Sequence, residues 1–148
     1  TMTTQIRESV FETNSSSTHS ISIATESRGI FDTIRNNNGV IEIILEHYEF
    51  GWDRYTYREA DCKLAYLMIY ARDWADGKDK EFYKIIVDVV EQQTSCKFLW
   101  NLEDEGGYID HQSVEDCDLH YMFYEPELIR QFIFNPSSYL ETDNDNEW

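Results

Sequence analysis

Cysteine is scarce in this sequence, and long apolar runs are absent. The three cysteines, Cys62, Cys96 and Cys117, form an odd set with no framework spacing. This argues against a disulfide scaffold and favours reduced thiols in a cytosolic protein. No charged-then-apolar leader precedes residue 20, and no run of about 18 apolar residues occurs. We therefore expect a cytoplasmic protein without membrane spans.

Basic residues are also scarce. The 148-residue chain carries 29 Asp and Glu against 12 Lys and Arg, a net charge of −17. A surface this acidic repels phosphate groups, which argues against direct binding to nucleic acid or anionic membranes and favours a partner with a basic surface. Apolar residues make up 41% and aromatic residues 15% of the chain. This is more than a disordered acidic chain would carry, and the length fits a single folded domain.

The negative charge is concentrated in the last third of the chain. Residues 1–97 hold 16 acidic and 11 basic residues, a net of −5, whereas residues 98–148 hold 13 acidic residues and one basic residue, Arg130, a net of −12. Such a surface can imitate duplex DNA, which presents a charge about every 1.7 Å. The alternative is that the charge only keeps the protein soluble. Aromatic residues, which often anchor protein interfaces, occur in the same part: Trp100, Tyr108, Tyr121, Phe123, Tyr124 and Tyr139.

Two helices are predicted from apolar residues that recur with a helical period. The first covers residues 60–75, where one apolar stripe includes Leu64 and Leu67, and Gly77 follows its end. The second covers roughly residues 79–93, and the short connector makes the two a helical hairpin. A third helix is expected to begin near Glu125, with Pro126 in its first turn, and to end at Asn135-Pro136.

The strands are predicted from alternating or continuous apolar runs, and with the helices they indicate an α+β fold. We expect one mixed or antiparallel sheet packed against the helical hairpin and the C-terminal helix. The predicted elements are an edge strand at 5–11, a half-buried strand at 20–24, a helical turn at 30–34 before NNNG (36–39), a central strand at 40–46, a hairpin of 96–102 with 108–112, and a mobile acidic tail at 141–148.

Several short segments resemble uncharacterised small proteins encoded by phages and prophages. The main one is VFETNSSSTHSI (10–21), and the others are EFGW (49–52), KLAYL (63–67), YIDHQS (108–113) and TDNDN (142–146). The resemblance implies a viral or prophage setting in the bacterial cytoplasm. It implies no activity, and it assigns no catalytic residue.

The polar stretch from Asn14 to His19 is open to two interpretations. Its side chains could form a turn that bonds nearby backbone groups before the strand begins. Alternatively, they could build the polar site of a small enzyme together with a second histidine. No G-x-S-x-G motif accompanies the serines. The candidate polar-site residues are Asn14, Ser15, Ser16, Ser17, Thr18, His19 and His111.

The sequence predicts no metal site and no cofactor. Cys117-x-x-His120 has the spacing of half a zinc site, but no second pair with such a spacing exists. The pair is therefore interpreted as a buried thiol beside a surface histidine and not as a zinc site.

The charge distribution therefore decides the functional prediction. We expect a non-catalytic acidic protein of phage type that binds and inhibits a host nucleic-acid-binding or defence-system protein by imitating nucleic acid. The small enzyme remains the alternative, and the oligomeric state stays open. The predicted partner-binding residues are Glu103, Asp104, Glu105, Asp110, Glu115, Asp116, Asp118, Tyr121 and Tyr124.

Overall fold

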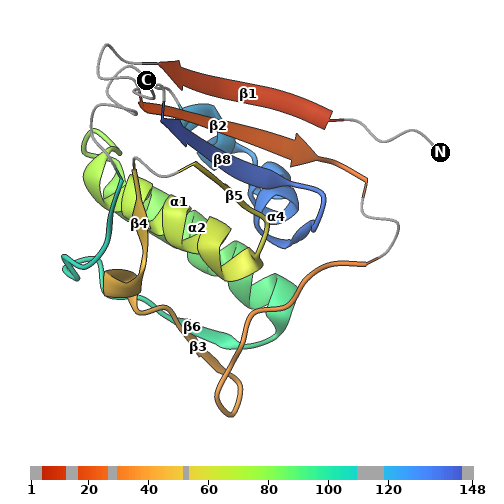
Figure 1. Cartoon of the computed structure of the whole chain (residues 1–148). Helices are drawn as coiled ribbons and strands as arrows, with labels where there is room; N and C mark the ends of the chain where they lie inside the picture. The colour runs from red at the N-terminus through yellow and green to blue at the C-terminus, as the bar shows by residue number, and fades with distance from the viewer. Residues whose placement is uncertain (1–4, 13–16, 27–29, 52–53, 110–118, 145–148) are drawn as a thin grey trace.

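A computed structural model describes residues 5–12, 17–26, 30–51, 54–109 and 119–144, and these residues form an α+β fold, as predicted (Figure 1). Its main sheet has four antiparallel strands in the order β1-β2-β8-β5. Their bounds are Gln5–Glu12 for β1, Ser17–Ala24 for β2, Tyr139–Asn144 for β8 and Tyr55–Tyr57 for β5. The predicted edge strand is confirmed as β1.

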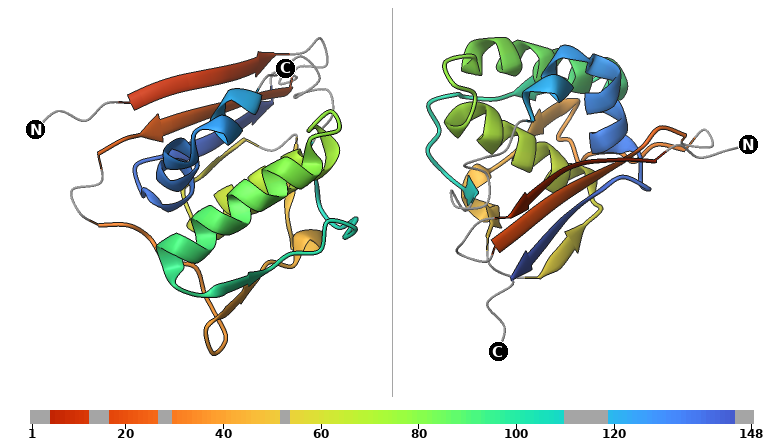
Figure 2. Two further views of the ribbon diagram at one scale, coloured as in Figure 1. Left: turned by 180° about the vertical axis from the view of Figure 1, so that it is seen from behind. Right: turned by 90° about the horizontal axis from the view of Figure 1, so that it is seen from above.

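Two short parallel pairs accompany the main sheet. Strand β3 (Val40–Glu42) pairs with β6 (Lys97–Leu99), and β4 (Glu49–Phe50) pairs with β7 (Tyr108–Ile109). Figures 1 and 2 show β3 and β6 beyond helix α1 (Ala60–Asp73), on the side away from the main sheet. The remaining elements are η1 (Leu45–His47), α2 (Asp79–Thr94), η2 (His120–Tyr124) and α4 (Pro126–Phe134).

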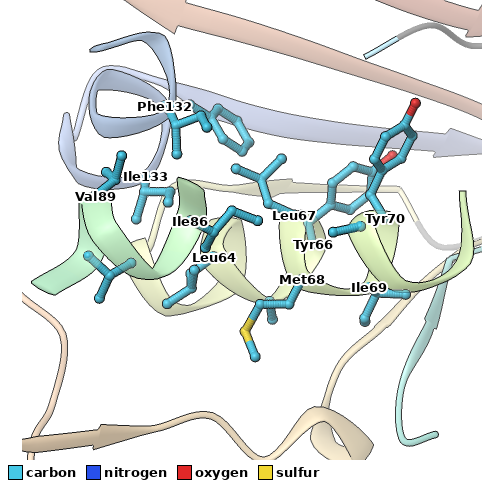
Figure 3. Close-up of a cluster of buried hydrophobic side chains, with 14 of the residues drawn as sticks. Leu64, Tyr66, Leu67, Met68, Ile69, Tyr70, Ile86, Val89, Phe132 and Ile133 are labelled. Carbon is cyan, nitrogen blue, oxygen red and sulfur yellow. The ribbon is translucent and has the colours of Figure 1, made fainter. Parts of the chain in front are cut away.

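Helices α1, α2 and α4 lie on one side of the main sheet (Figure 2). Their apolar residues form the core together with apolar residues of the strands. Leu64 and Leu67 of α1, Ile86 of α2 and Phe132 of α4 are completely buried, and Figure 3 shows them converging between the helices. Burial of each such side chain contributes about 1.5–3 kcal/mol. The predicted burial of both helical stripes is therefore confirmed.

Helix α1 is buried all round, although a single apolar stripe was predicted. Every residue from Lys63 to Ala71 is buried, since α2, α4 and β7 all contact this helix. Its segment LAYLMIYA (64–71) is apolar on all faces, which is typical of a helix inside a core. Gly77, in the connector to α2, has a φ of +87° and serves the turn as expected.

One buried polar cluster links three elements near the end of α4. Lys63 Nζ donates hydrogen bonds to the carbonyl oxygens of Asn135 (3.0 Å) and Ser138 (2.9 Å). Asn135 Nδ2 and Ser138 Oγ in turn bond the backbone of Ala24, at the end of β2. Burial lowers the pKa of Lys63 to about 8. The cluster ties α1 and α4 to the main sheet.

Several predicted strands and turns are wrong. Residues 30–34 form no helix, and 40–46 is not a central strand, because only the short β3 forms there and Ile44 is 50% exposed. The segments 96–102 and 108–112 do not pair with each other, since β6 pairs with β3 and β7 with β4. Residues 141–144 are not a tail but the end of β8, an interior strand of the main sheet. Residues 145–148 lie outside the described residues.

Candidate partner-binding surface

The predicted acidic residues 103–105 lie in the segment 101–107 between β6 and β7, which we call the acidic loop. The Asn101 carbonyl accepts from the Asp104 amide at 3.0 Å, and the Asp104 carboxylate accepts from the Gly106 amide at 2.8 Å. These bonds give the loop a defined turn. The side chains of Glu103 and Glu105 are exposed, whereas Asp104 is half-buried.

Arg72, at the end of α1, holds the acidic loop by its backbone. Its guanidinium donates to the carbonyl oxygens of Asp104 (2.7 Å), Gly106 (2.5 Å) and Gly107 (3.1 Å). It also makes a two-pronged contact with the Asp73 carboxylate at 2.7 Å, and this hydrogen bond raises the pKa of Arg72. A planar guanidinium is suited to several acceptors at fixed angles. The guanidinium of Arg72 is thus engaged by the loop backbone and Asp73, and the carboxylates of Glu103 and Glu105 remain available to a partner.

The glycine pair in the loop serves close packing and not a hairpin. A Cβ atom on Gly107, whose φ is +72°, would lie 2.4 Å from the Leu45 carbonyl oxygen, and one on Gly106 would lie 2.7 Å from the Glu46 amide nitrogen. Only glycine lets the backbone approach η1 so closely. The Tyr108 amide then bonds the Tyr48 carbonyl at 3.2 Å. The acidic loop is therefore fixed on both sides, by Arg72 and by η1.

The end of α1 adds further negative charge beside the acidic loop. Asp73 follows Arg72 directly, and the carbonyl end of a helix carries a partial negative charge itself. We call the acidic loop together with Asp73 the acidic end. A hollow of about 500 Å³ opens here, lined by Arg72, Asp73, Leu102, Glu103 and Glu105. Among the described residues, no ion pair joins Glu103 or Glu105 to a basic side chain.

The other residues predicted to bind a partner are only partly placed. Asp110, Glu115, Asp116 and Asp118 lie outside the described residues. Tyr121 is half-buried, and Tyr124 is 54% exposed and accepts a hydrogen bond from Lys78 at 2.7 Å.

The aromatic residues of the last third do not form one surface. Trp100 and Phe123 are buried in the core, and Tyr139 is half-buried beneath the guanidinium of Arg58. Tyr108 and Tyr124 are exposed, at 44% and 54%, and of these two only Tyr124 was among the predicted partner-binding residues. Tyr108 follows the acidic loop directly, so it is the aromatic residue best placed to accompany the acidic end.

The residues of the predicted polar site are placed only in part. Ser17, Thr18 and His19 belong to strand β2, and His19 is completely buried, so the interpretation as a solvated turn is wrong for these residues. The remaining candidates, Asn14, Ser15, Ser16 and His111, lie outside the described residues, as does Cys117 of the half zinc site.

His19 bonds groups far away in the sequence. Its Nδ1 lies 3.2 Å from the Tyr66 hydroxyl and its Nε2 lies 3.4 Å from the Gly51 carbonyl. The carbonyl can only accept, so Nε2 donates to it, and in a neutral ring Nδ1 then accepts from the Tyr66 hydroxyl. Both ring nitrogens are thereby occupied inside the core, and the imidazole is not presented to a substrate.

Sequence reasoning missed two features. Arg72 looked like an ordinary charged residue in a helix, although its position just before the end of the 60–75 stripe could have suggested contact with a neighbouring loop. A groove of about 880 Å³ over β3 was also missed, because the asparagines at 36–38 were interpreted only as a helix stop. The Asn38-Gly39 pair, with φ values of +52° and +81°, instead turns the chain tightly between Asn37 and Val40.

Among the residues that the structure describes, no group of three or more His, Cys, Asp or Glu side chains could hold a metal ion. None of the described helices is both long and apolar enough to cross a membrane.

No protein-family model, curated protein or solved structure matches this chain.

Proposed function

We propose that this chain is a non-catalytic acidic protein of phage type that binds and inhibits a basic host protein in the bacterial cytoplasm. The preferred targets are a nucleic-acid-binding factor or a component of a defence system, because such proteins carry basic surfaces built to receive phosphates. The acidic end is the proposed contact surface, and imitation of nucleic acid is the proposed mode of inhibition.

The observation that supports this proposal best is the way in which Arg72 holds the acidic loop. In a flexible acidic segment, the ordering of the chain on binding would cost free energy. Here the loop backbone is already fixed by three bonds from Arg72 and by its packing on η1. Two exposed glutamates therefore stand on an ordered backbone, next to the carboxylate of Asp73.

The electrostatics of the chain favour fast and salt-sensitive association. A net charge of −17 attracts a basic partner over distances up to the Debye length, about 8–10 Å at physiological salt. The ordered carboxylates then fix the orientation of the partner, and Tyr108 can supply an apolar contact at the edge. The alternative enzyme is not carried further, because His19 is buried among its hydrogen-bond partners.

The proposal is tested by affinity capture from a bacterial host lysate at low and high salt. The test variant is Glu103→Gln with Glu105→Gln, which removes two charges and keeps the shape. The matched control is Glu59→Gln with Asp88→Asn, which removes two charges from exposed positions outside the acidic end. The wild type and the control should retain basic proteins at low salt and release them at high salt, and the test variant should retain much less.

Equal capture by the test and control variants would contradict the proposal, because binding would then depend on the net charge of the protein and not on the position of the charges. Capture that does not respond to salt would also contradict it, since screening weakens contacts between exposed charges.

A further inference from the structure

The groove over β3 combines apolar and polar groups in a manner that suits an extended peptide. Its walls come from the irregular segment 33–38, from the outward side chains of β3 and of Ile44, and from His47, Tyr48 and Asp61. Its volume of about 880 Å³ lies within the usual range for binding sites. Ile44 is half exposed there and offers an apolar contact.

The polar groups of the groove can satisfy both the backbone and a charged side chain of a ligand. The exposed guanidinium of Arg35 can donate hydrogen bonds, and the exposed amides of Asn37 and Asn38 can both donate and accept them, as an extended peptide backbone requires. Glu42 and Asp61 supply carboxylates to the same groove. These carboxylates outnumber the single arginine, so the groove favours a ligand with positive charge.

Asp61 is the fixed anchor within the groove. The Tyr48 hydroxyl donates to Asp61 Oδ2 at 2.7 Å, and burial together with this hydrogen bond raises the pKa of Tyr48, so the hydroxyl remains a donor. A carboxylate has about four acceptor positions. Asp61 is therefore held in place by one bond while it keeps capacity to accept a lysine or arginine from a ligand.

The groove and the acidic end are neighbours on either side of η1. Gly106 and Gly107 of the acidic loop pack against the backbone of Leu45 and Glu46, while His47 and Tyr48 line the groove. Glu46 is exposed between them. A basic segment that contacts the acidic loop can thus continue across η1 into the groove without leaving a negatively charged surface.

The irregular chain beside the groove also fits a binding role. Residues 30–36 have neither helix nor strand structure, and the Asp32 amide joins this segment to α4 through the Phe134 carbonyl at 2.7 Å. Binding residues are often carried by irregular segments that a rigid scaffold positions.

We propose that the groove binds an extended segment of the partner protein, with a lysine or arginine side chain on Asp61 and Glu42 and an apolar neighbour on Ile44. This inference rests on the proposed function, because the basic partner that contacts the acidic end also supplies the segment. It defines the partner further as one with a flexible basic stretch.

The test is a titration of the ¹⁵N-labelled full chain with a short synthetic peptide of alternating arginine and alanine, followed by NMR. A peptide of alternating glutamate and alanine is the ligand control. Amide signals of residues 33–48 and of the acidic loop should both shift with the arginine peptide. Asp61→Asn, which can still accept from Tyr48, should weaken binding at the groove about tenfold, and Asp88→Asn should leave it unchanged. The unshifted signals of the core show that each variant is folded.

The outcomes separate the two proposals. Shifts confined to the acidic loop, or groove shifts that are equal in Asp61→Asn and the wild type, would overturn the groove proposal and leave the proposed function intact. The opposite result is also possible. Asp61→Asn could weaken the groove shifts while Glu103→Gln/Glu105→Gln captures as much basic protein as its control variant. That result would support the groove and contradict the acidic end. Equal shifts with the glutamate peptide would overturn the role of charge in the groove.

Discussion

Replacement of Arg72 by lysine should loosen the acidic loop although the positive charge is kept. The guanidinium of Arg72 reaches three loop carbonyls, those of Asp104, Gly106 and Gly107, at 2.5–3.1 Å. A lysine ammonium is a compact group on a flexible stem, and it cannot reproduce this fork. We expect at least two of the three bonds to be lost. Each is worth about 1–1.5 kcal/mol at a site that water can partly reach, so the free energy of unfolding should fall by roughly 2–3 kcal/mol.

The assay combines urea denaturation with hydrogen exchange of the amides in residues 103–107. Arg130→Lys is the matched control, because Arg130 contacts Glu127 and Gln93 on the surface, where such a change costs at most about 1 kcal/mol. Arg72→Lys should lower stability more than the control and should speed exchange in the loop. If Arg72→Lys proves as stable as Arg130→Lys and exchange in the loop is unchanged, Arg72 does not hold the loop in the way that its contacts indicate.

Three further predictions concern stability. Gly107→Ala should destabilise the protein by more than about 2 kcal/mol, because the added Cβ would collide with the backbone of η1. Gly39→Ala is the control: its φ is also positive but the space around it is open, so it should cost only about 1–2 kcal/mol. Equal losses of stability in thermal denaturation would contradict this. His19→Ala should cost about 2–4 kcal/mol through the cavity and the lost bond from Tyr66, and urea midpoints at the wild-type value would speak against it. Burial lowers the pKa of Lys63 from 10.5 to about 8, so the unfolded chain binds this proton more tightly than the folded protein does. The free energy of unfolding should therefore rise between about pH 8 and 10.5, by up to roughly 3 kcal/mol relative to the Lys63→Met variant. A difference between the two proteins that does not change with pH would refute this.

The helices could be predicted from the sequence because their signal is local. The apolar spacing in 60–75 and 79–93 describes contacts within one helix, and α1 and α2 follow it closely. The single stripe predicted for α1 is wrong because the uninterrupted apolar segment 64–71 has apolar residues on every face of the helix. A helix that is apolar on all faces belongs inside a core.

The sheet was predicted less well, because strand pairing joins residues that are distant in sequence. In the segment 40–46, Ile41, Ile43 and Leu45 point inward and the residues between them outward, which is the alternation of a strand with one solvated face. The apolar Ile44 in an outward position concealed that pattern. Strand β8 was missed because its acidic composition suggests solvent, although pairing with β2 uses only the backbone.

The candidate site was predictable as a charge distribution but not as a geometry. The excess of carboxylates after residue 97 is visible in the sequence, and it correctly marked Glu103 and Glu105 as exposed. The roles of Arg72 and Asp61 were not visible, because each depends on a partner 13 to 35 residues away. Periodicity carries no information about such contacts.

The position of Arg72 also explains why a strongly acidic loop need not be a flexible one. Like charges on neighbouring side chains repel, so a run such as Glu103-Asp104-Glu105 tends to extend the chain. The bonds from Arg72 act on the carbonyl oxygens and not on the carboxylates of this run. Among the residues that the structure describes, its ion pair is with Asp73. The backbone is therefore ordered while the charge of the side chains is preserved. A salt bridge to Glu103 or Glu105 would have ordered the loop equally well, but it would have removed the negative field that a basic partner recognises.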